Sequence, residues 1–322
     1  MATGPVDPRF AQVPQLFFVI GAQKSGTSWL HRYLAGHPEV CVPVHKETNY
    51  WRAVDRGPRY AENDGSAFAR RYRKIVKPDL RARLRRLVRP ATRPKPELVK
   101  SLRMVNQALV QAGRPHDAYA DLLFHQETGQ TRAVGEVCPQ YALLSRQTYS
   151  EMAGLAEDVG FVFIMRDPAA RAVSAIKHGL RSRLGRHARI DPETLANAIS
   201  EGLRTQRGWG FDKTHYHKTL DELEKAVSAD RIHLMFYETM FDSAEIARLD
   251  AFLGVGPHEA EFGYRANADT TPDVTADIGQ KQALAVAFAD VYAAMAQRFG
   301  DGLPAAWRDS MALAAQAEVA DA

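Results

Sequence analysis

The stretch FFVIGAQKSGTSWL, residues 17–30, decides the fold because an apolar run leads through a glycine-containing loop into a helical pattern. This order of strand, loop and helix places backbone amides around a phosphate group at a helix N-terminus. In the nucleoside-triphosphate loop, a Lys that reaches the outer phosphates follows the second glycine, and a hydroxyl residue that binds magnesium comes next. Here Gly26 and Ser28 fit, but Thr27 takes the place of that Lys, and Lys24 lies inside the loop. The stretch therefore predicts a phosphate site of a different kind.

Further apolar runs occur along the chain, at residues 133–137, 161–165 and 232–236, and helical patterns separate them. This alternation is typical of an α/β fold in which helices cover both faces of a mostly parallel sheet. Such sheets bind ligands beyond the carboxyl ends of their strands. We therefore expect the chemistry in the residues that directly follow each apolar run.

The composition is that of an ordinary globular chain, with 322 residues, 45% hydrophobic and 25% charged. We expect one domain over residues 1–322, divided into a core at about 15–51 and 131–300, a basic helical insertion at about 52–130 and a frayed tail at about 310–322. Cys41 and Cys138 form neither a disulfide framework nor a zinc-binding spacing, so they predict two reduced thiols.

The net charge of +4 is mildly basic, and Arg and Lys are concentrated in the insertion. That segment predicts either two short helices with solvated basic faces or a contact surface for an anionic acceptor, membrane headgroups or nucleic acid. Few aromatic residues interleave with the basic ones, so we expect no nucleic-acid partner. The N-terminus has no secretory pattern, and no apolar run is long enough to cross a bilayer, so we expect a cytoplasmic protein. The oligomeric state has no signature in the sequence.

A second candidate site lies in FVFIMRDPAARAVSAIKH, residues 161–178. Arg166 follows a buried run, Asp167 and Pro168 can start a helix, and Ser174 comes about two helical turns later. Arg166 can bind a phosphate through its guanidinium, and the hydroxyl of Ser174 can donate to the same group. By itself the segment is equally consistent with a capped helix and a local ion pair.

Both segments resemble motifs of the sulfotransferases that use 3′-phosphoadenosine-5′-phosphosulfate (PAPS). GAQKSGTSWL is similar to their 5′-phosphosulfate loop, and RDPAARAVSAIKH is similar to their 3′-phosphate motif. The resemblance implies a P-loop-like fold with three layers, PAPS as co-substrate, adenosine 3′,5′-bisphosphate as product and no metal. It implies that the donor is bound by Gln23, Lys24, Ser25, Gly26, Thr27, Ser28, Arg166 and Ser174.

The segment KETNYW, residues 46–51, resembles the glycan-type and bacterial members of that family, in which the Glu is the catalytic base. The resemblance implies that Glu47 is the base. The cytosolic branch uses a His, and His45 is the rival because residues two apart face the same side of an extended segment. Glu47 could instead be a surface carboxylate paired with Lys46 or Arg52.

The resemblance implies sulfuryl transfer to a hydroxyl acceptor, such as a glycan, a glycolipid or a small alcohol, with Lys24 stabilising the departing phosphate. Two features depart from the family. GEVCPQY, residues 135–141, lacks a second catalytic lysine, and YRANADTTPDV, residues 264–274, stands where cytosolic members carry an Arg-Lys-Gly loop.

Two other functions remain open from the sequence, a nucleotide-dependent kinase or NTPase and a non-catalytic anion-binding module. His215 and His217 could ligate a metal, but no third ligand lies at a supporting spacing, which favours a structural or acceptor-side role.

Overall fold

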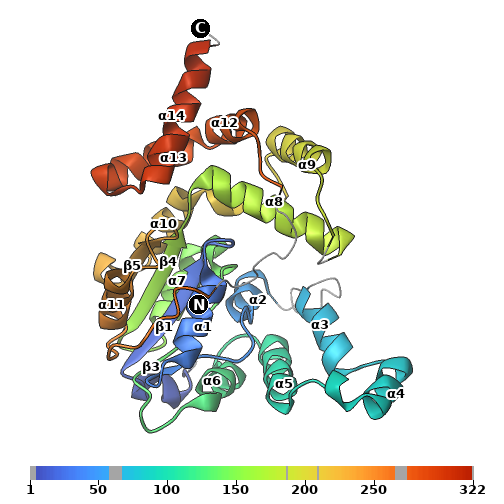
Figure 1. Ribbon diagram of the computed structural model, residues 1–322. Coiled ribbons are helices and arrows are strands. Elements are labelled where there is room, and N and C mark those ends of the chain that lie inside the picture. Colours follow the sequence, from blue (N-terminus) through green and yellow to red (C-terminus); the bar gives the residue numbers. More distant parts are fainter. Residues whose placement is uncertain (1–4, 58–66, 186–187, 209, 265–273, 321–322) are drawn as a thin grey trace.

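The centre of the fold is a parallel sheet of five strands in the computed structural model, which describes residues 5–57, 67–185, 188–208, 210–264 and 274–320 (Figure 1). The strand order is β2-β3-β1-β4-β5, and every neighbouring pair is parallel. The strands are β1 (Gln15–Gly21), β2 (Val40–Cys41), β3 (Ala133–Val137), β4 (Val159–Met165) and β5 (Ile232–Phe236). Four of them coincide with the apolar runs of the sequence, so the predicted α/β fold is confirmed. The two residues of β2 are too few to give a pattern of their own.

The register brings the carboxyl ends of the three central strands together. Val19 of β1 lies opposite Val137 of β3 and Val162 of β4. The segments that follow these strands therefore meet at one edge of the sheet, where α/β folds bind their ligands.

Helices cover both faces of the sheet. On one face, α1 (Thr27–Gly36) and α11 (Ser243–Phe252) bury side chains such as Trp29 and Leu249 against Val19 and Val162. The other face packs Phe18 and Phe161 against a larger helical layer. This layer includes the helices α7 (Arg146–Ala153), α8 (Pro168–Leu184), α9 (Pro192–Thr205) and α10 (Tyr216–Glu224).

The segment between β2 and β3 is helical. It contains α2 (Tyr50–Arg56), α3 (Ala67–Val76), α4 (Leu80–Val88), α5 (Pro96–Val110) and α6 (Asp117–Leu123). α5 and α6 belong to the core, because Val105 and Tyr119 are fully buried. α4 has no buried residue and lies at the outside of the molecule (Figure 1). The division into a core and an insertion stays a prediction.

The C-terminal helices stack on the end of the molecule that carries α8 and α9 (Figure 1). They are α12 (Ile278–Ala287), α13 (Ala289–Phe299) and α14 (Ala305–Ala320). The stretch expected to fray is helical up to Ala320, since it is rich in alanine and Trp307 anchors its start in the core. No helix in these described ranges is long and apolar enough to cross a bilayer.

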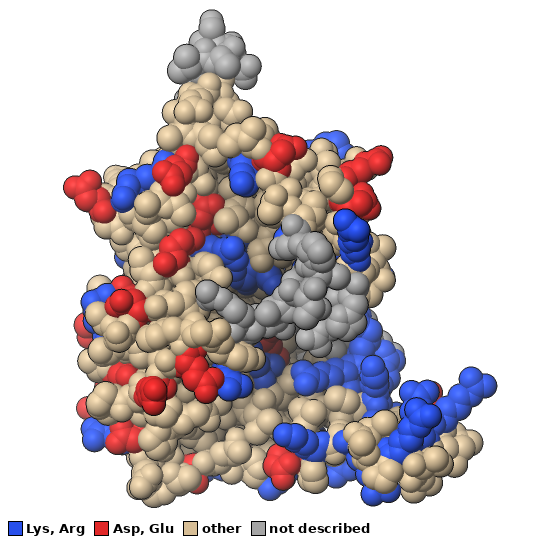
Figure 2. All heavy atoms as spheres, in the orientation of Figure 1, with Lys and Arg blue, Asp and Glu red and all other residues tan. Residues whose placement is uncertain are grey.

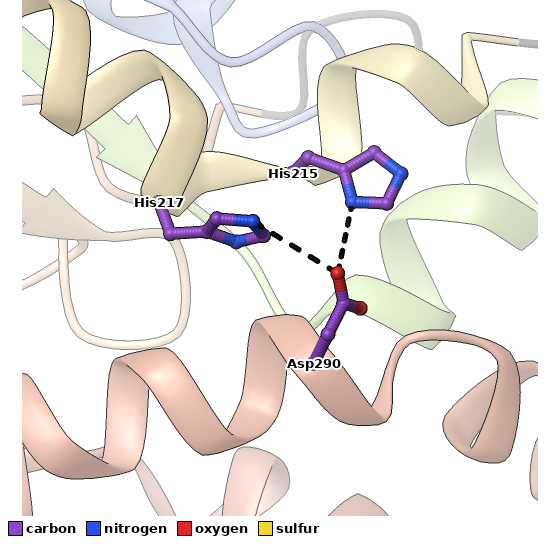
Figure 3. Close-up of side chains that lie close together, drawn as sticks. All are labelled: His215, His217 and Asp290. Carbon is purple, nitrogen blue, oxygen red and sulfur yellow. Dashed lines mark ion pairs between the residues drawn. The ribbon is translucent and has the colours of Figure 1, made fainter.

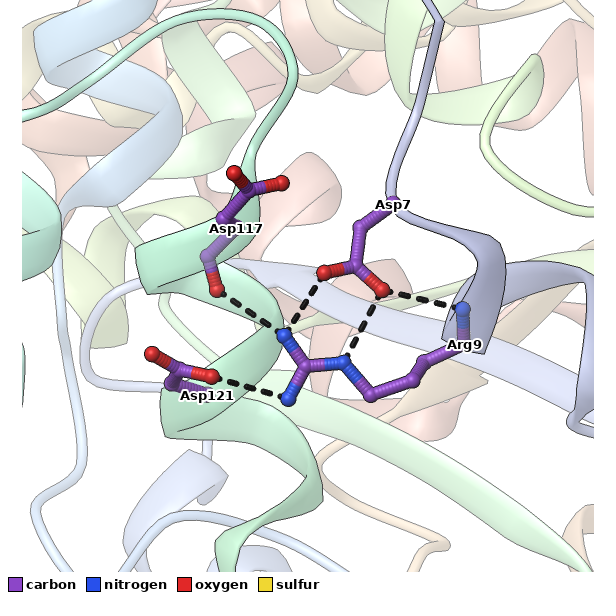
Figure 4. A network of polar contacts seen from close by, with 4 residues as sticks. All are labelled: Asp7, Arg9, Asp117 and Asp121. Carbon is purple, nitrogen blue, oxygen red and sulfur yellow. Dashed lines mark hydrogen bonds and ion pairs between the residues drawn. The ribbon is translucent and has the colours of Figure 1, made fainter.

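An arginine holds the N-terminal segment to the body of the protein (Figure 4). Arg9, in the short 3₁₀ helix η1 (Pro8–Gln12), donates to both carboxylate oxygens of Asp7 at 2.9 and 2.6 Å. It also donates to the Asp121 carboxylate at 2.8 Å and to the backbone oxygen of Asp117 at 3.3 Å, both on α6. These bonds fasten the chain just before β1.

The other 3₁₀ helices are η3 (Pro90–Thr92), η4 (Phe124–Gln126), η5 (Tyr141–Leu143), η6 (Phe211–Thr214), η7 (Ala229–Arg231) and η8 (Gly300–Gly302).

Candidate active site

The loop between β1 and α1 has the backbone of a tight anion cradle. Lys24 and Gly26 both have positive φ, +73° and +81°. The positive φ favours glycine at position 26, and a Cβ atom there would also lie 2.6 Å from the sulfur of Met240, which would have to move. The hydroxyl of Ser25 is buried and has no hydrogen-bond partner within the described part of the chain. A buried donor without a partner, at the start of a helix, fits an anionic ligand.

Lys46 lies over the N-terminus of α1, and sequence reasoning assigned it no role beyond a pairing with Glu47. Its ammonium group donates to the hydroxyls of Thr27 at 3.0 Å and Ser28 at 3.1 Å, and contacts the Glu47 carboxylate at 3.2 Å. The ammonium adds positive charge where the helix dipole is already positive, so the site attracts an anion more strongly than the helix alone.

Lys24 lies in a strongly positive environment. Burial, followed by the nearby charges of Arg166 and Lys46, lowers the pKa of Lys24 to about 8. Burial first, and like charges second, therefore destabilise its ammonium form until an anion binds among these cations.

Arg166 stands where the sequence placed it, directly after β4, and reaches the loop. Its guanidinium donates to the backbone oxygen of Lys24 at 3.1 Å and stacks over the ring of Tyr237 at 4.3 Å. Asp167 caps α8 by accepting from the amide of Ala170 at 2.7 Å. The predicted cap is therefore present, and the contact of Arg166 with the loop is an addition that the sequence did not predict. Ser174 is half-buried on α8, and its hydroxyl makes no hydrogen bond within the described residues.

Two further cations hold the loop from the side of α8 and η6, and sequence reasoning missed both. Arg171 is fully buried and donates to the backbone oxygens of Gln23 at 3.4 Å and Gly210 at 2.7 Å. Lys213 donates to the side-chain oxygen of Gln23 at 3.0 Å. Gln23 is thereby held by residues that are far away in the sequence. No local sequence pattern predicts such contacts.

The structure separates the two candidate bases. Glu47 has φ +64° and a side chain that is 37% exposed, so the segment is not extended here and His45 does not share its side. His45 is buried against Phe68, and burial followed by the charge of Arg71 lowers the pKa of His45 to about 4. Only Glu47 combines access from solvent with contact to Lys46.

A buried carboxylate supports the segment that carries Glu47. Glu136, at the end of β3, accepts hydrogen bonds from Thr48 at 2.5 Å, Tyr119 at 2.6 Å and Tyr141 at 2.5 Å. Burial raises the pKa of Glu136, and the three hydroxyl donors oppose that shift. The network fixes Thr48, and with it the position of Glu47.

Residues 265–273 of the segment that replaces the Arg-Lys-Gly loop lie outside the described residues.

Comparison with known proteins identifies the family of the chain. The sequence profile of the Sulfotransferase family matches residues 14–259. A search of curated protein sequences found no significant match. Among solved structures, a sulfotransferase from Alicyclobacillus acidocaldarius has 22% identity and a TM-score of 0.58, and the match covers 91% of this chain and 98% of that one.

Two sulfotransferase domains are also similar. The domain of the Synechococcus PCC 7002 olefin synthase has 20% identity and a TM-score of 0.48, covering 83% of this chain and 81% of that one. The domain from the curacin biosynthetic pathway has 15% identity and a TM-score of 0.47, covering 81% of each chain. The similarity to the Alicyclobacillus structure supports a P-loop-like fold. Because the family profile spans well over half of its residues, the chain belongs to the sulfotransferase family.

Proposed function

We propose that the protein transfers a sulfuryl group from PAPS to a hydroxyl group of an acceptor. The observation that carries this proposal is the convergence of Lys24, Lys46 and Arg166 on the N-terminus of α1, beside the accessible carboxylate of Glu47. PAPS supplies the sulfuryl group, and its 5′- and 3′-phosphates account for the two separate anion sites of the sequence.

The loop and α8 would bind the two ends of the donor. Backbone amides of residues 26–28, the free hydroxyl of Ser25 and the ammonium of Lys24 suit the 5′-phosphosulfate. Arg166 and Ser174 suit the 3′-phosphate. The guanidinium of Arg166 also joins the two sites, because it donates to the backbone of Lys24.

Three residues would supply the acid–base and electrostatic catalysis of the transfer. Glu47 would accept the proton of the acceptor hydroxyl, while Lys24 and Lys46 would stabilise the negative charge that develops on the departing phosphate oxygen. Sulfuryl transfer resembles phosphoryl transfer in that positioning and charge stabilisation supply most of the rate enhancement.

Contacts of the loop also argue against a kinase or NTPase. In those enzymes the hydroxyl after the lysine binds magnesium. Here the ammonium of Lys46 binds the hydroxyls of Thr27 and Ser28, so a fixed cation of the chain takes the place of a metal ion. A non-catalytic anion-binding module would not need the accessible carboxylate of Glu47 next to that cation.

The proposed acceptor is a carbohydrate, a glycolipid or a small alcohol, because KETNYW resembles the glycan-type segment. Transfer of labelled sulfate to a panel of extracts from the source organism would identify the acceptor.

The function is tested by ligand-induced stabilisation. Adenosine 3′,5′-bisphosphate at about 100 times its Kd should stabilise the native state by about 2.7 kcal/mol and raise the melting temperature by several degrees. ATP with magnesium, and adenosine 5′-monophosphate at the same concentration, should raise it much less. Equal stabilisation by ATP with magnesium would contradict the proposed donor and favour an NTPase.

Arg166→Gln and Ser174→Ala test the assignment of the 3′-phosphate site. Both variants should lose affinity for the bisphosphate, measured by calorimetry, while their weaker affinity for adenosine 5′-monophosphate stays nearly unchanged. Equal losses for the two ligands would show that these residues do not bind the 3′-phosphate.

A further inference from the structure

A cluster of two histidines and an aspartate lies outside the candidate active site (Figure 3). His215 stands at the N-terminus of α10, His217 follows in its first turn, and Asp290 comes from the first turn of α13. Nδ1 of His215 is 3.5 Å and Nε2 of His217 is 3.9 Å from the same carboxylate oxygen of Asp290. The fold therefore supplies the third ligand that the sequence lacked at a supporting spacing.

The separations suit a metal ion better than hydrogen bonds. Zinc bonds of about 2.0–2.2 Å in a tetrahedral site place ligand atoms about 3.3–3.5 Å apart, so small side-chain shifts would complete the site. Both contacts are too long for good hydrogen bonds. Nδ1 of His215 is shielded from solvent and has no hydrogen-bond partner within the residues described. An enclosed nitrogen that lies 3.5 Å from a carboxylate oxygen, beyond the distance of a good hydrogen bond, is an available ligand.

We propose that His215, His217 and Asp290 bind a divalent transition-metal ion such as Zn²⁺. Two imidazoles and one carboxylate are a common zinc ligand set. The side chain of Asp290 is 55% exposed, so the ion enters from solvent and keeps a coordination position open to water.

The ion would fasten two elements that position the end of β4. Tyr216, between the two histidines, donates to the backbone oxygen of Arg166 at 2.7 Å. Tyr292, two residues after Asp290, donates to the carboxylate of Asp167 at 2.7 Å. A bond between α10 and α13 through the ion would hold these two tyrosines in a fixed relation. The site lies outside the transfer chemistry, so its test is independent of the proposed function.

Calorimetric titration of the full-length, chelator-treated protein with Zn²⁺ tests the site. We expect one ion per chain, and a loss of affinity of at least about tenfold in His217→Asn and in Asp290→Asn, since even the loss of a residue behind a ligand costs 10–100-fold. Visible absorption of bound Co²⁺ should show nitrogen and oxygen coordination in the wild type and disappear in both variants. His125→Asn, at an exposed histidine on η4, should bind like the wild type. Absence of stoichiometric binding, or equal affinity in all variants, would overturn the proposal and leave an ordinary His–Asp contact.

A second inference rests on the hairpin of α3 and α4, residues 67–95. The hairpin holds twelve of the 42 Lys and Arg residues and one of the 38 Asp and Glu residues, which gives it a net charge of +11 and leaves −7 for the rest of the chain. The basic side chains gather over these helices (Figure 2). Arg86 closes the hairpin by donating to the backbone oxygens of Ile75 at 3.0 Å and Lys74 at 2.9 Å.

α4 adds an apolar stripe to this charge. Leu80, Leu84, Leu87 and Val88 recur at the spacing of one helix face and are 71%, 52%, 67% and 80% exposed. Arginines occupy four of the five remaining positions of α4, and Ala82 occupies the fifth. A soluble polyanion needs only the charge, whereas an anionic lipid surface binds both the charge and the apolar stripe.

We infer that α4 lies in the surface of an anionic phospholipid membrane, with its leucines in the acyl boundary and the arginines at the headgroups. A membrane-borne acceptor would then be held close to the protein.

Co-sedimentation with vesicles tests this surface. We expect binding to vesicles of phosphatidylcholine mixed with phosphatidylglycerol, and none to phosphatidylcholine alone. Leu84→Ser combined with Leu87→Ser should weaken binding at least about tenfold, because the lost contact is apolar. Ile278→Ser, at an equally exposed position on α12, should bind like the wild type. Absence of vesicle binding, or heparin binding with vesicle binding that is indifferent to the Leu→Ser changes, would overturn the inference in favour of a soluble polyanion.

Discussion

Lys24→Ala should lower kcat by at least about 10²-fold, which is the usual cost of losing a group that stabilises charge in the transition state. The loss is expected because the ammonium of Lys24 lies in the loop where the departing phosphate would be held, and the neighbouring cations Lys46 and Arg166 are already fixed by other bonds. Single-turnover kinetics with labelled donor would separate this loss from slow product release.

The pH profile offers an independent check on Lys24. Its pKa of about 8 means that the ammonium form predominates below this pH and is lost above it. kcat/KM for the donor reports the free enzyme, so it should fall as the pH rises through about 8. In Lys24→Ala this alkaline fall should disappear.

Lys225→Ala is the control, because Lys225 is exposed and pairs only loosely with Glu222 at 3.6 Å. It should keep the activity of the wild type. Turnover of Lys24→Ala within a few-fold of the wild type would remove Lys24 from the mechanism.

Local patterns were enough to predict most of the sheet. The run at residues 161–165 became part of β4, whose seven residues are all buried, because a buried parallel strand is apolar along its whole length. The run at 232–236 became β5, a half-buried strand at the edge of the sheet. The same rule predicted that Arg166 would stand at the carboxyl end of β4, and the structure brings it to the loop of Lys24.

The partners that local patterns did not predict are residues far apart in the sequence. Lys46 reaches Thr27 across 19 residues, and Arg171 reaches Gln23 across 148. Tyr119 and Thr48 meet at Glu136 only because α6 and the segment after β2 pack on the same face of the sheet. The pairing of His217 with Asp290 depends on the packing of α13 against α10 in the same way. Such partners become visible only when the helices are placed.

His45 and Glu47 would face the same side only if residues 45–47 were extended, and that condition is not met for a physical reason. Glu47 and Asn49 both take positive φ values, +64° and +60°, which turn the chain between the buried His45 and the first turn of α2. Asn adopts positive φ more readily than most residues, so Asn49 is a weak signal, but nothing in KETNYW predicts the positive φ of Glu47.

Glu47→Gln should keep donor affinity and lose about 10²-fold or more in kcat, because a general base acts only as the proton is transferred. Gln has the same length and can keep a contact with Lys46. Gln and Glu are equally disfavoured at a backbone position with φ +64°, so the substitution adds no backbone strain. A lower kcat would therefore not result from collapse of the site. Rapid-quench measurement of kcat, with calorimetry of adenosine 3′,5′-bisphosphate, would report the two quantities separately.

His45→Ala decides between the two candidate bases. The ring of His45 is buried beside Phe68, and a pKa of about 4 makes it a weak proton acceptor, so its removal should cost packing and leave kcat within a few-fold of the wild type. The reverse result, an active Glu47→Gln and an inactive His45→Ala that still folds and binds the bisphosphate, would transfer the base to His45. It would then place the protein nearer the branch that uses histidine, and the accessible contact between Glu47 and Lys46 would serve to position the loop.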